Sequence, residues 1–437
     1  MIPQTLKGFR DFLPDTMAPR QQMIRTIEDA FARHGFLPLQ TPALEYLETL
    51  LGKYGEEGDK LLYRFEDNGG RNVALRYDLT VPLARLVAQH RAEIVLPFRR
   101  FHIAPVWRAE KPQRGRFREF LQCDADICGV DSPMADAEVL VTGLATLRAL
   151  GVHGARLHLN HRDVLFGMLE VLGISEKPKQ IICIRAIDKL DKIGKDGVVA
   201  EIVREAAVET AQAAEIVAAF DGGGGIEPIA ALAAGKGHTA LDAALLRLQA
   251  VVELVAAAGL GEQVVIDRSI ARGLDYYTGI IYETRLTDPK VASIGAVMSG
   301  GRYDGLIGLF GKEQIAAVGI SIGLDRLLAA LQELGLLAQG LAQVPIYVMP
   351  LDASVAGPAL AMASELRAAG LRVEVDLAGG RIGKQFERAG KRGARLALVL
   401  GSDELAAGEV VVKDLAAGAQ TKVARAALAA TLQQLLG

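Results

Sequence analysis

The side chains most able to do chemistry in this sequence are concentrated in one segment. FRRFHIAPVW and RFREFLQCDADIC flank a polar, glycine-containing connection at 108–116, a pattern typical of a β-hairpin. Alternate residues of a strand share one face. On the returning strand that face carries Arg118, Phe120, Gln122, Asp124 and Asp126. A cation, an aromatic ring, an amide and two carboxyl groups could together bind a ligand, but the polar side of an exposed edge hairpin would alternate in the same way, so the spacing leaves both interpretations open.

The sequence lacks the glycine-rich loops by which many nucleotide-binding proteins hold phosphates. It contains no GxxxxGK[ST] segment and no GxGxxG segment after a strand. If the chain uses a nucleotide, side chains must supply the positive charge, and guanidinium groups suit phosphate oxygens because they offer paired donors. We therefore expect an antiparallel sheet with arginines on one face.

Composition excludes several classes of protein. With 437 residues, of which 50% are hydrophobic, the chain can bury a large core in two or three domains. Three cysteines form no disulfide framework, and His158 and His161 have no cysteine or acidic cluster beside them in the sequence, so we expect no zinc or other protein-held metal. The start of the chain lacks the apolar stretch of a signal peptide and no later run reaches ~18 apolar residues, which predicts no membrane segment and a cytoplasmic location.

Hydrophobic periodicity predicts the elements that position the hairpin. Apolar residues recur at helical spacing from Ala18 to His34, and Gly35 follows as a helix cap. LYRFED and RNVALR flank Asn68-Gly69-Gly70 and predict a second hairpin. After about residue 161 the sequence becomes alanine-rich and favours helices. Strand-like VVIDR then leads to SGGRYDG, which we expect to be a glycine-rich turn, and to a helix carrying the apolar residues Ile322, Leu324, Leu327 and Leu328.

The C-terminal part has a different pattern. Beyond a linker near 335–343, PIYVMPL, LRVEVDL, RLALVLG and EVVVKDL alternate with helical patterns, which predicts an α/β domain. One of its helices carries a basic stripe of Arg381, Lys384, Arg388, Lys391 and Arg392. The stripe could neutralise phosphates, although solubility alone also produces such stripes. The net charge of −3 gives no general attraction to nucleic acid, so any RNA contact must come from local patches of this kind.

Five segments in order resemble a known family. VWRAE with RFREF is similar to motif 2 of class II aminoacyl-tRNA synthetases, AVGISIGLDRL at 317–327 to motif 3, and GFLPLQTPALE to motif 1. LRYDLTVPLAR at 75–85 and RGLDYYTG at 272–279 resemble segments of histidyl-tRNA synthetases. The resemblance implies an α+β fold: a class II antiparallel β-sheet catalytic core flanked by helices (1–160 and 263–335), a helical insertion domain (161–262) and a C-terminal α/β anticodon-binding domain (343–437).

The resemblance also implies a function. Such an enzyme activates L-histidine with ATP to histidyl-adenylate and pyrophosphate, then transfers histidine to the 3′ end of tRNA(His). It implies ATP as a substrate, Mg²⁺ bound with the ATP phosphates, and a homodimer formed through motif 1. Because the site would hydrogen-bond the polar groups of its substrate, no hydrolytic editing is needed, and the inserted domain is better interpreted as a tRNA clamp.

Residue roles follow for ATP. The resemblance places Arg108 at the α-phosphate and Arg326 at the γ-phosphate, with Glu110 accepting from the adenine amino group and Phe120 stacking on the base. It places Arg272 at the α-phosphate opposite Arg108. Charge that develops there during attack would be met from both sides, so Arg272 and Arg108 are the predicted catalytic residues.

Histidine presents an ammonium group, a carboxylate and an imidazole, and the pocket must bind all three. The resemblance assigns Asp78, Thr80 and Gln122 to the amino end and Asp126, Tyr276 and Tyr277 to the ring. The full set of predicted histidine-binding residues is Asp78, Thr80, Arg108, Gln122, Asp126, Arg272, Tyr276, Tyr277 and Tyr303. Asp78 stands where many bacterial relatives have glutamate, so the charge is kept while the depth of the amino-group site changes. Ordinary core packing is the alternative for Tyr276 and Tyr277.

Three rival interpretations remain. A histidine-sensing regulatory subunit of ATP phosphoribosyltransferase would lack the C-terminal domain and the RGLDYYTG residues, and both are present. An RNA-binding adaptor with an inactive synthetase fold is opposed by the intact Arg108, Arg272 and Arg326. A synthetase of another specificity is opposed by the pairing of Asp78 with Asp126.

Overall fold

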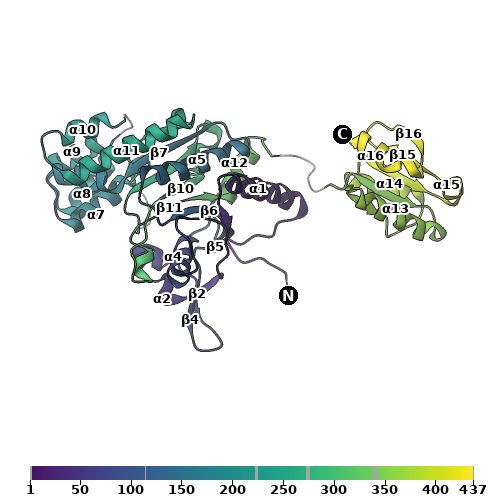
Figure 1. Ribbon diagram of the computed structural model, residues 1–437, viewed down its shortest axis with the longest axis horizontal. Helices are drawn as coiled ribbons and strands as arrows, with labels where there is room; N and C mark the ends of the chain where they lie inside the picture. The colour runs from purple at the N-terminus through teal and green to yellow at the C-terminus, as the bar shows by residue number, and fades with distance from the viewer. Residues whose placement is uncertain (1, 114, 222–224, 272–275, 338–342, 437) are drawn as a thin grey trace. The chain divides into compact units, whose positions relative to one another are not determined.

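The computed structural model describes residues 2–113, 115–221, 225–271, 276–337 and 343–436 (Figure 1). Contacts between Cα atoms divide the chain into a first unit, Met1–Asp11 with Arg20–Leu337, and a second unit, Phe12–Pro19 with Ala338–Gly437. No helix in the described ranges is both long enough and apolar enough to cross a lipid bilayer.

The first unit is built on a large sheet of eight strands among the described residues, in the order β1-β5-β6-β11-β10-β9-β7-β8. In that order the strands are Leu37–Pro38, Phe98–Trp107, Glu119–Cys128, Ala317–Gly323, Met298–Arg302, Ile280–Leu286, Ala155–His161 and Val264–Ile266. Neighbours are antiparallel except for the β1/β5 and β7/β8 pairs. The predicted antiparallel core and the β5–β6 hairpin are confirmed.

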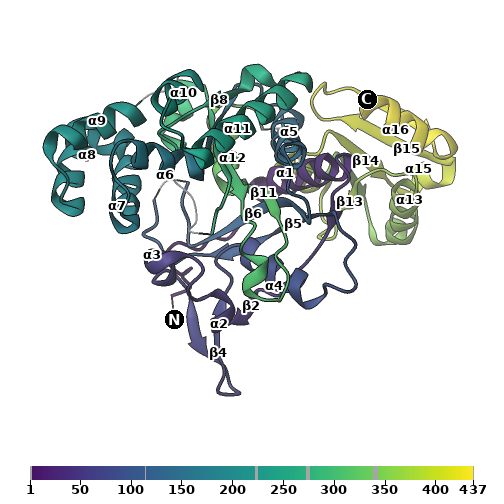
Figure 2. The same cartoon turned by 60° about the vertical axis from the view of Figure 1, so that its left-hand side comes forward.

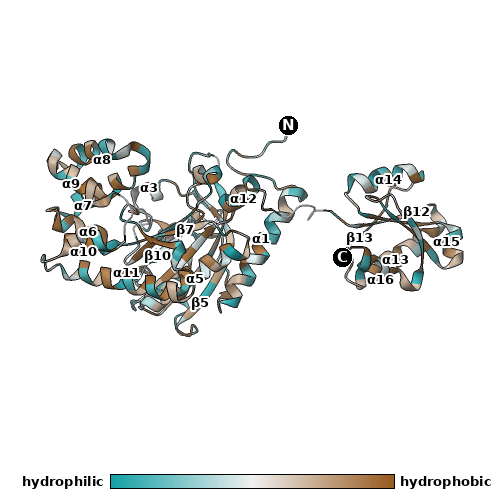
Figure 3. Cartoon of the chain, turned by 90° about the horizontal axis from the view of Figure 1, so that it is seen from above, coloured by the Kyte–Doolittle hydropathy of each residue, from teal (hydrophilic) through white to brown (hydrophobic). Residues whose placement is uncertain are grey.

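The sheet has one apolar face and one polar face. The register of the strands places apolar residues of one strand opposite apolar residues of the next. Cys123 of β6 lies opposite Ile322 of β11, and Ala125 lies opposite Ile320. This face belongs to a core that also contains buried residues of α1 (Pro14–Arg33), α5 (Pro133–Ala149) and α12 (Leu324–Glu333). Figure 2 shows these helices beside the central strands, and Figure 3 shows hydrophobic colouring along them. The opposite face is left for a binding site.

A small second sheet lies in the same unit. Its strands are β2 (Leu44–Tyr46), β4 (Asn72–Leu75) and β3 (Arg64–Glu66), in that order. The β3–β4 hairpin is the one predicted around Asn68-Gly69-Gly70. Asp67 closes its turn by accepting hydrogen bonds from the backbone N–H groups of Gly69 and Arg71. The short helices α2 (Leu47–Leu50), α3 (Gly55–Asp59) and α4 (Thr80–Gln89) complete this part.

Helices occupy the chain between β7 and β8, as predicted. They are α6 (Arg162–Val171), α7 (Lys177–Ile187), α8 (Leu190–Ala206), α9 (Thr210–Phe220), α10 (Glu227–Ala233) and α11 (Thr239–Ala257). Their buried residues are continuous with the core of the large sheet. Arg247 of α11 also donates to buried Asp136 of α5 at 2.6 Å. The helical segment is thus joined to the sheet by both packing and charge, and its boundaries as a separate domain stay a prediction.

Two local predictions were wrong. SGGRYDG was expected to be a turn, but Ser299–Arg302 belongs to β10 and the chain turns only after it. Its glycines allow close approach: a Cβ on Gly300 would overlap the Gly319 carbonyl, and one on Gly301 would lie 2.8 Å from the Tyr277 ring. Ile322, expected on a helix, is the penultimate residue of β11, and α12 begins at Leu324.

The second unit is an α/β domain, as predicted. Its sheet has the order β13-β12-β14-β15-β16, in which the first three strands are parallel and the last two form an antiparallel edge. The strands are Val373–Val375, Ile346–Pro350, Leu396–Leu400, Glu409–Asp414 and Gln420–Ala424. The helices are α13 (Ala356–Ala368), α14 (Ile382–Lys391), α15 (Ser402–Ala407) and α16 (Leu428–Leu436).

Candidate active site

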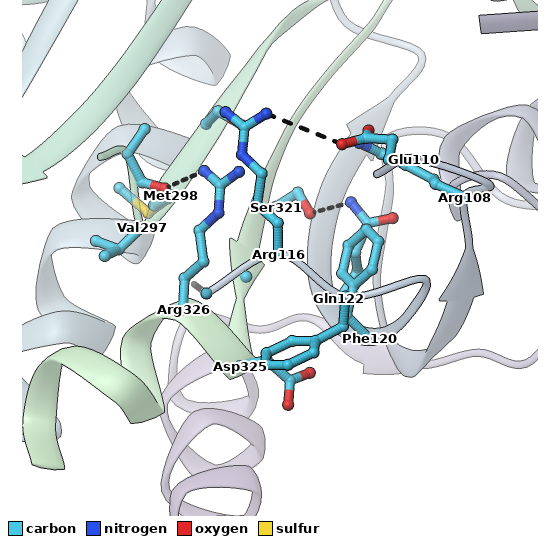
Figure 4. Close-up of a pocket in the computed structure, with 15 residues that line it drawn as sticks. Arg108, Glu110, Arg116, Phe120, Gln122, Val297, Met298, Ser321, Asp325 and Arg326 are labelled. Atoms are coloured by element: carbon cyan, nitrogen blue, oxygen red, sulfur yellow. Dashed lines mark hydrogen bonds and ion pairs between the residues drawn. The ribbon is translucent and has the colours of Figure 1, made fainter. Parts of the chain in front are cut away.

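A pocket opens on the polar face of the large sheet (Figure 4). Its cavity has a volume of about 130 Å³. Three segments line it: the β5–β6 hairpin, the residues entering β10, and the β11–α12 junction. The residues labelled there are Arg108, Glu110, Arg116, Phe120, Gln122, Val297, Met298, Ser321, Asp325 and Arg326. The predicted ATP-binding residues therefore all lie in one pocket.

Three arginines of the described ranges line this pocket. Arg326 Nη1 donates to the carbonyl oxygen of Ala296 at 2.9 Å, and Arg108 Nε donates to the carbonyl oxygen of Tyr77 at 3.1 Å. Arg116 Nη1 lies 3.9 Å from Glu110 Oε2. Burial, followed by repulsion from Arg116 and Arg108, lowers the pKa of Arg326 to about 10. The cations destabilise one another while no anion is bound, so the pocket suits a polyanion.

Aromatic rings hold Arg108 in place. Its guanidinium carbon lies 4.3 Å from the centroid of the Tyr77 ring and 5.2 Å from that of Phe120. Cation–π contacts of this kind favour a fixed orientation of the planar guanidinium. Phe120 thus contacts Arg108 and also lines the pocket.

Asp325, to which the sequence analysis gave no role, connects the elements that line the pocket. It is almost fully buried and accepts hydrogen bonds from Arg10 Nη2 at 2.6 Å, Arg20 Nη2 at 3.1 Å and the backbone N–H of Leu121 at 2.8 Å. Asp325 precedes Arg326 in α12, so these contacts fix the start of that helix against β6 and α1. Its partners come from distant parts of the sequence, and no local pattern announces them.

The five side chains predicted to share one face of the returning strand have three different settings, and Arg118 precedes the first residue of β6. Phe120 and Gln122 line the pocket. Arg118 does not line it; its Nε donates to the carbonyl oxygen of Glu110 at 3.0 Å and so holds the hairpin loop. Asp124 and Asp126 are buried deeper in the sheet face.

Asp78 lies in a buried ring of hydroxyl and amide donors. It accepts from Tyr54 Oη at 3.1 Å, Tyr276 Oη at 2.9 Å and the Val81 N–H at 3.1 Å. Burial raises the pKa of this carboxyl group. Asp78 and Tyr276, which were assigned to opposite ends of a bound histidine, are hydrogen-bonded to each other. Thr80 is the first residue of α4, two positions after Asp78.

Asp126 forms an ion pair and accepts a hydrogen bond. The guanidinium of Arg100, fully buried on β5, lies 2.7 Å away, and Tyr303 Oη donates to Asp126 Oδ1 at 2.5 Å. Tyr276 packs edge-on against Tyr277 and Tyr303, with ring centroids 5.1 and 6.0 Å apart. The predicted ring-binding residues gather here. Tyr276 and Tyr277 also pack against an apolar cluster, as their alternative interpretation foresaw.

Asp124 is a second buried carboxyl group, to which sequence reasoning gave no role. Burial, with the nearby Asp126 charge adding to it and Arg100 opposing it, raises the pKa of Asp124 from its usual 3.8 to about 8. Between these two values the folded protein holds a proton that the unfolded chain has lost, so stability falls as pH rises through this window.

We predict that Asp124→Asn, which cannot ionise, stabilises the first unit, and more so at higher pH. Between pH 5 and 7 the gap to the wild type should widen by up to ~1.4 kcal/mol per pH unit, the value of one proton. Urea unfolding followed by the fluorescence of Trp107, the only tryptophan in the sequence, measures it. A gap that does not change with pH would mean that Asp124 is ionised throughout.

Arg272, the first choice for a catalytic residue, lies outside the described residues, as does Asp275. Arg116 is a further pocket residue, besides Asp325, to which the sequence analysis gave no role. The available signal was a basic side chain inside the motif 2 loop.

The site combines an antiparallel sheet with an arginine from a hairpin, an aromatic ring and a second arginine at a strand–helix junction. This arrangement defines a class II aminoacyl-tRNA synthetase. The sequence profile of histidyl-tRNA synthetase matches residues 8–327, and that of an anticodon binding domain matches residues 345–435. The chain belongs to the histidyl-tRNA synthetase family, whose general activity is the two-step, ATP-dependent ligation of histidine to tRNA.

Individual relatives agree with this assignment. The chain is 45% identical over 418 residues to the histidine–tRNA ligase of Rhodopirellula baltica, covering 95% of this chain and 93% of the relative. It is 46% identical over 343 residues to the histidine–tRNA ligase of Treponema denticola, covering 76% and 74%. The crystal structure of histidyl-tRNA synthetase from Nostoc sp. PCC 7120 superimposes with a TM-score of 0.86 at 32% identity, covering 99% of both chains.

Proposed function

We propose that this pocket makes histidyl-adenylate with its own arginines. The observation that carries the proposal is the convergence of Arg108, Arg116 and Arg326 in one pocket, which Phe120 and Gln122 of β6 also line. A carboxylate oxygen of histidine attacks the α-phosphorus of ATP, the bond to the bridging oxygen breaks, and pyrophosphate leaves. Arg108 holds the α-phosphate and Arg326 the γ-phosphate, while Phe120 and Glu110 bind adenine.

Histidine would lie deeper on the same sheet face. Asp78, Thr80 and Gln122 receive the α-ammonium group, and the buried setting of Asp78 supports a cationic partner because an added positive charge would favour its ionised form. Asp126, with Tyr277 and Tyr303, binds the imidazole. Tyr276 lies between these two groups, since its hydroxyl is hydrogen-bonded to Asp78.

Magnesium would enter with the nucleotide. The described residues contain no group of three or more His, Cys, Asp or Glu side chains placed to hold a metal. The carboxylate of Glu283 lies within electrostatic reach of Arg326 and would be the residue to contact a metal bound to the phosphates. When bound, Mg²⁺ neutralises phosphate charge; the chain's own residues position and polarise the α-phosphate.

We propose Arg272 as the second cation at the α-phosphate. Arg272→Ala is expected to lower activation by about 10²-fold, the effect of removing one transition-state donor, and to leave histidine binding largely in place. Single-turnover formation of adenylate measures the first quantity and equilibrium binding of histidine the second. Near-normal activation by this variant would remove Arg272 from the mechanism.

The tRNA would contact at least two parts of the chain. In the second unit the basic stripe on α14 is a candidate, but Arg388 is committed to Asp376 through a two-pronged contact at 2.7 and 2.9 Å. The phosphate-binding role then falls to the more exposed Arg381, Lys384, Lys391 and Arg392. The last three form surface ion pairs with Glu387 or Glu374, which a phosphate would have to displace. The helical segment at 161–262 would form a domain that clamps the tRNA, as its resemblance implies.

Two further parts of the proposal concern assembly and location. Exposed apolar residues on and after the predicted motif 1, among them Leu37, Leu44 and Tyr46, support a homodimer interface. The proposed role in protein synthesis supports a cytoplasmic location for the enzyme. Two observations argue against a binding-only adaptor and against a histidine sensor. They are the three arginines of the described pocket and the match to an anticodon binding domain. Single-turnover adenylate formation decides between an enzyme and either rival.

A further inference from the structure

Ser321 lies between two residues of the neighbouring strand. On the polar face of the sheet, Ser321 of β11 pairs with Asp124 of β6, and Gly323 pairs with Gln122. Gln122 Nε2 donates to Ser321 Oγ at 2.7 Å, as Figure 4 shows, and Ser321 lies close enough to Asp124 to lower the pKa of its carboxyl group. Gln122, Ser321 and Asp124 therefore form one polar row across the two strands.

The number of protons sets the direction of the contact. A serine hydroxyl has a single proton to donate. Because Ser321 accepts from the Gln122 amide, its own proton is left to face the paired Asp124. A carboxyl group has an oxygen able to accept whether or not its other oxygen is protonated. The direction is thus the same for neutral and ionised Asp124.

This direction leaves the Gln122 amide oxygen available. Gln122 is largely buried, and among the described residues Oε1 is a buried acceptor without a hydrogen-bond partner. Buried acceptors without partners are rare in folded proteins and call for a ligand or a water. The residue lines the pocket, so the acceptor belongs to the site.

We propose that Ser321 and Asp124 are positioning residues that hold the Gln122 amide with its oxygen toward the α-ammonium group of the substrate. An ammonium group has three donors and no acceptor, so an amide turned the other way would present N–H groups to it and repel it. The inference rests on the proposed histidine site and extends it to residues that act only through Gln122.

Two ligands separate this role from a general structural one. Histidinol keeps the ammonium group and imidazole but lacks the carboxylate, whereas 3-(imidazol-4-yl)propanoate keeps the carboxylate and imidazole but lacks the ammonium group. Titration calorimetry with the full-length protein measures their binding without requiring catalysis. Ser321→Ala should weaken histidinol about tenfold, the scale of one hydrogen bond to a charged group. It should change propanoate binding less than about twofold.

Three further variants complete the test. Ser321→Thr keeps the hydroxyl and should bind histidinol like the wild type. In a Gln122→Ala background, Ser321→Ala should have no additional effect on histidinol, because a residue that acts through another loses its effect when that partner is absent. Ser364→Ala on α13, an exposed serine of the second unit, is the matched control and should bind both ligands normally.

Several outcomes would overturn the inference: equal losses for both ligands in Ser321→Ala, no loss for either, a full additional loss in the Gln122→Ala background, or no histidinol binding by the wild type. The proposed function is tested separately by adenylate formation. Histidine activation by the wild type, with unselective losses in Ser321→Ala, would remove only the positioning role. The selective pattern in a protein that forms no adenylate would keep the positioning role and remove the proposed activity.

Discussion

Arg326→Ala should lower histidine-dependent ATP–pyrophosphate exchange by about 10²- to 10³-fold, the cost of removing one preorganised charge from a water-excluded site. The same change should not destabilise the protein. Burial and the repulsion of Arg116 and Arg108 lower the pKa of Arg326, which means that its charge is disfavoured in the ligand-free fold. Activity and stability should therefore move independently.

Steady-state exchange and a thermal unfolding scan of the same preparation measure both quantities. Arg156→Ala, an exposed arginine on β7 of the same sheet, is the control and should change neither. Loss of exchange that is matched by loss of folded protein would mean that Arg326 is a structural residue. Full exchange would remove it from the phosphate site.

Asp126→Asn should destabilise the first unit by roughly 3 kcal/mol. Removing one member of a buried ion pair typically costs ~3–5 kcal/mol, because the remaining charge is left without its partner. Arg100 is fully buried, and loss of the Asp126 charge lets the nearby Asp124 ionise more readily and offset part of that cost, which places the effect at the lower end. The substitution keeps the shape of the side chain and an oxygen for the Tyr303 hydroxyl, so the measured cost is mainly that of the charge.

The double variant Arg100→Met/Asp126→Asn separates stability from binding. It removes both charges and should recover most of the lost stability while histidine still binds poorly and ATP binds normally. Urea unfolding followed by Trp107 fluorescence gives the first result, and titration with each substrate gives the second. Asp196→Asn on α8, an exposed carboxylate, is the matched control. Recovery of histidine binding in the double variant would show that Asp126 serves only to neutralise Arg100.

Much of the local structure followed from the sequence because it depends on local rules. The two hairpins and the first helix were predicted from turn residues and hydrophobic spacing, and each is present. The edge strand Gln420–Ala424 was not predicted, since most of its side chains are exposed and polar or small. Ser299–Arg302 was misassigned because glycines that permit close strand packing resemble glycines of a turn.

The order of strands in the large sheet could not be derived in this way. β6 pairs with β11 across the whole helical segment, and such a pairing leaves no local signal. The same reason hid the residues that support the site: Asp325 gathers Arg10 and Arg20, and Asp126 depends on Arg100. Spacing alone found the face of β6, while the roles of its side chains came from the resemblance.

The most direct test of the whole account is amino-acid-dependent ATP–pyrophosphate exchange, with purified protein and magnesium, across all twenty amino acids. We expect exchange with histidine alone, and we expect the Arg326→Ala variant to lose that exchange. No exchange with histidine from a folded protein, or comparable exchange with another amino acid, would contradict it.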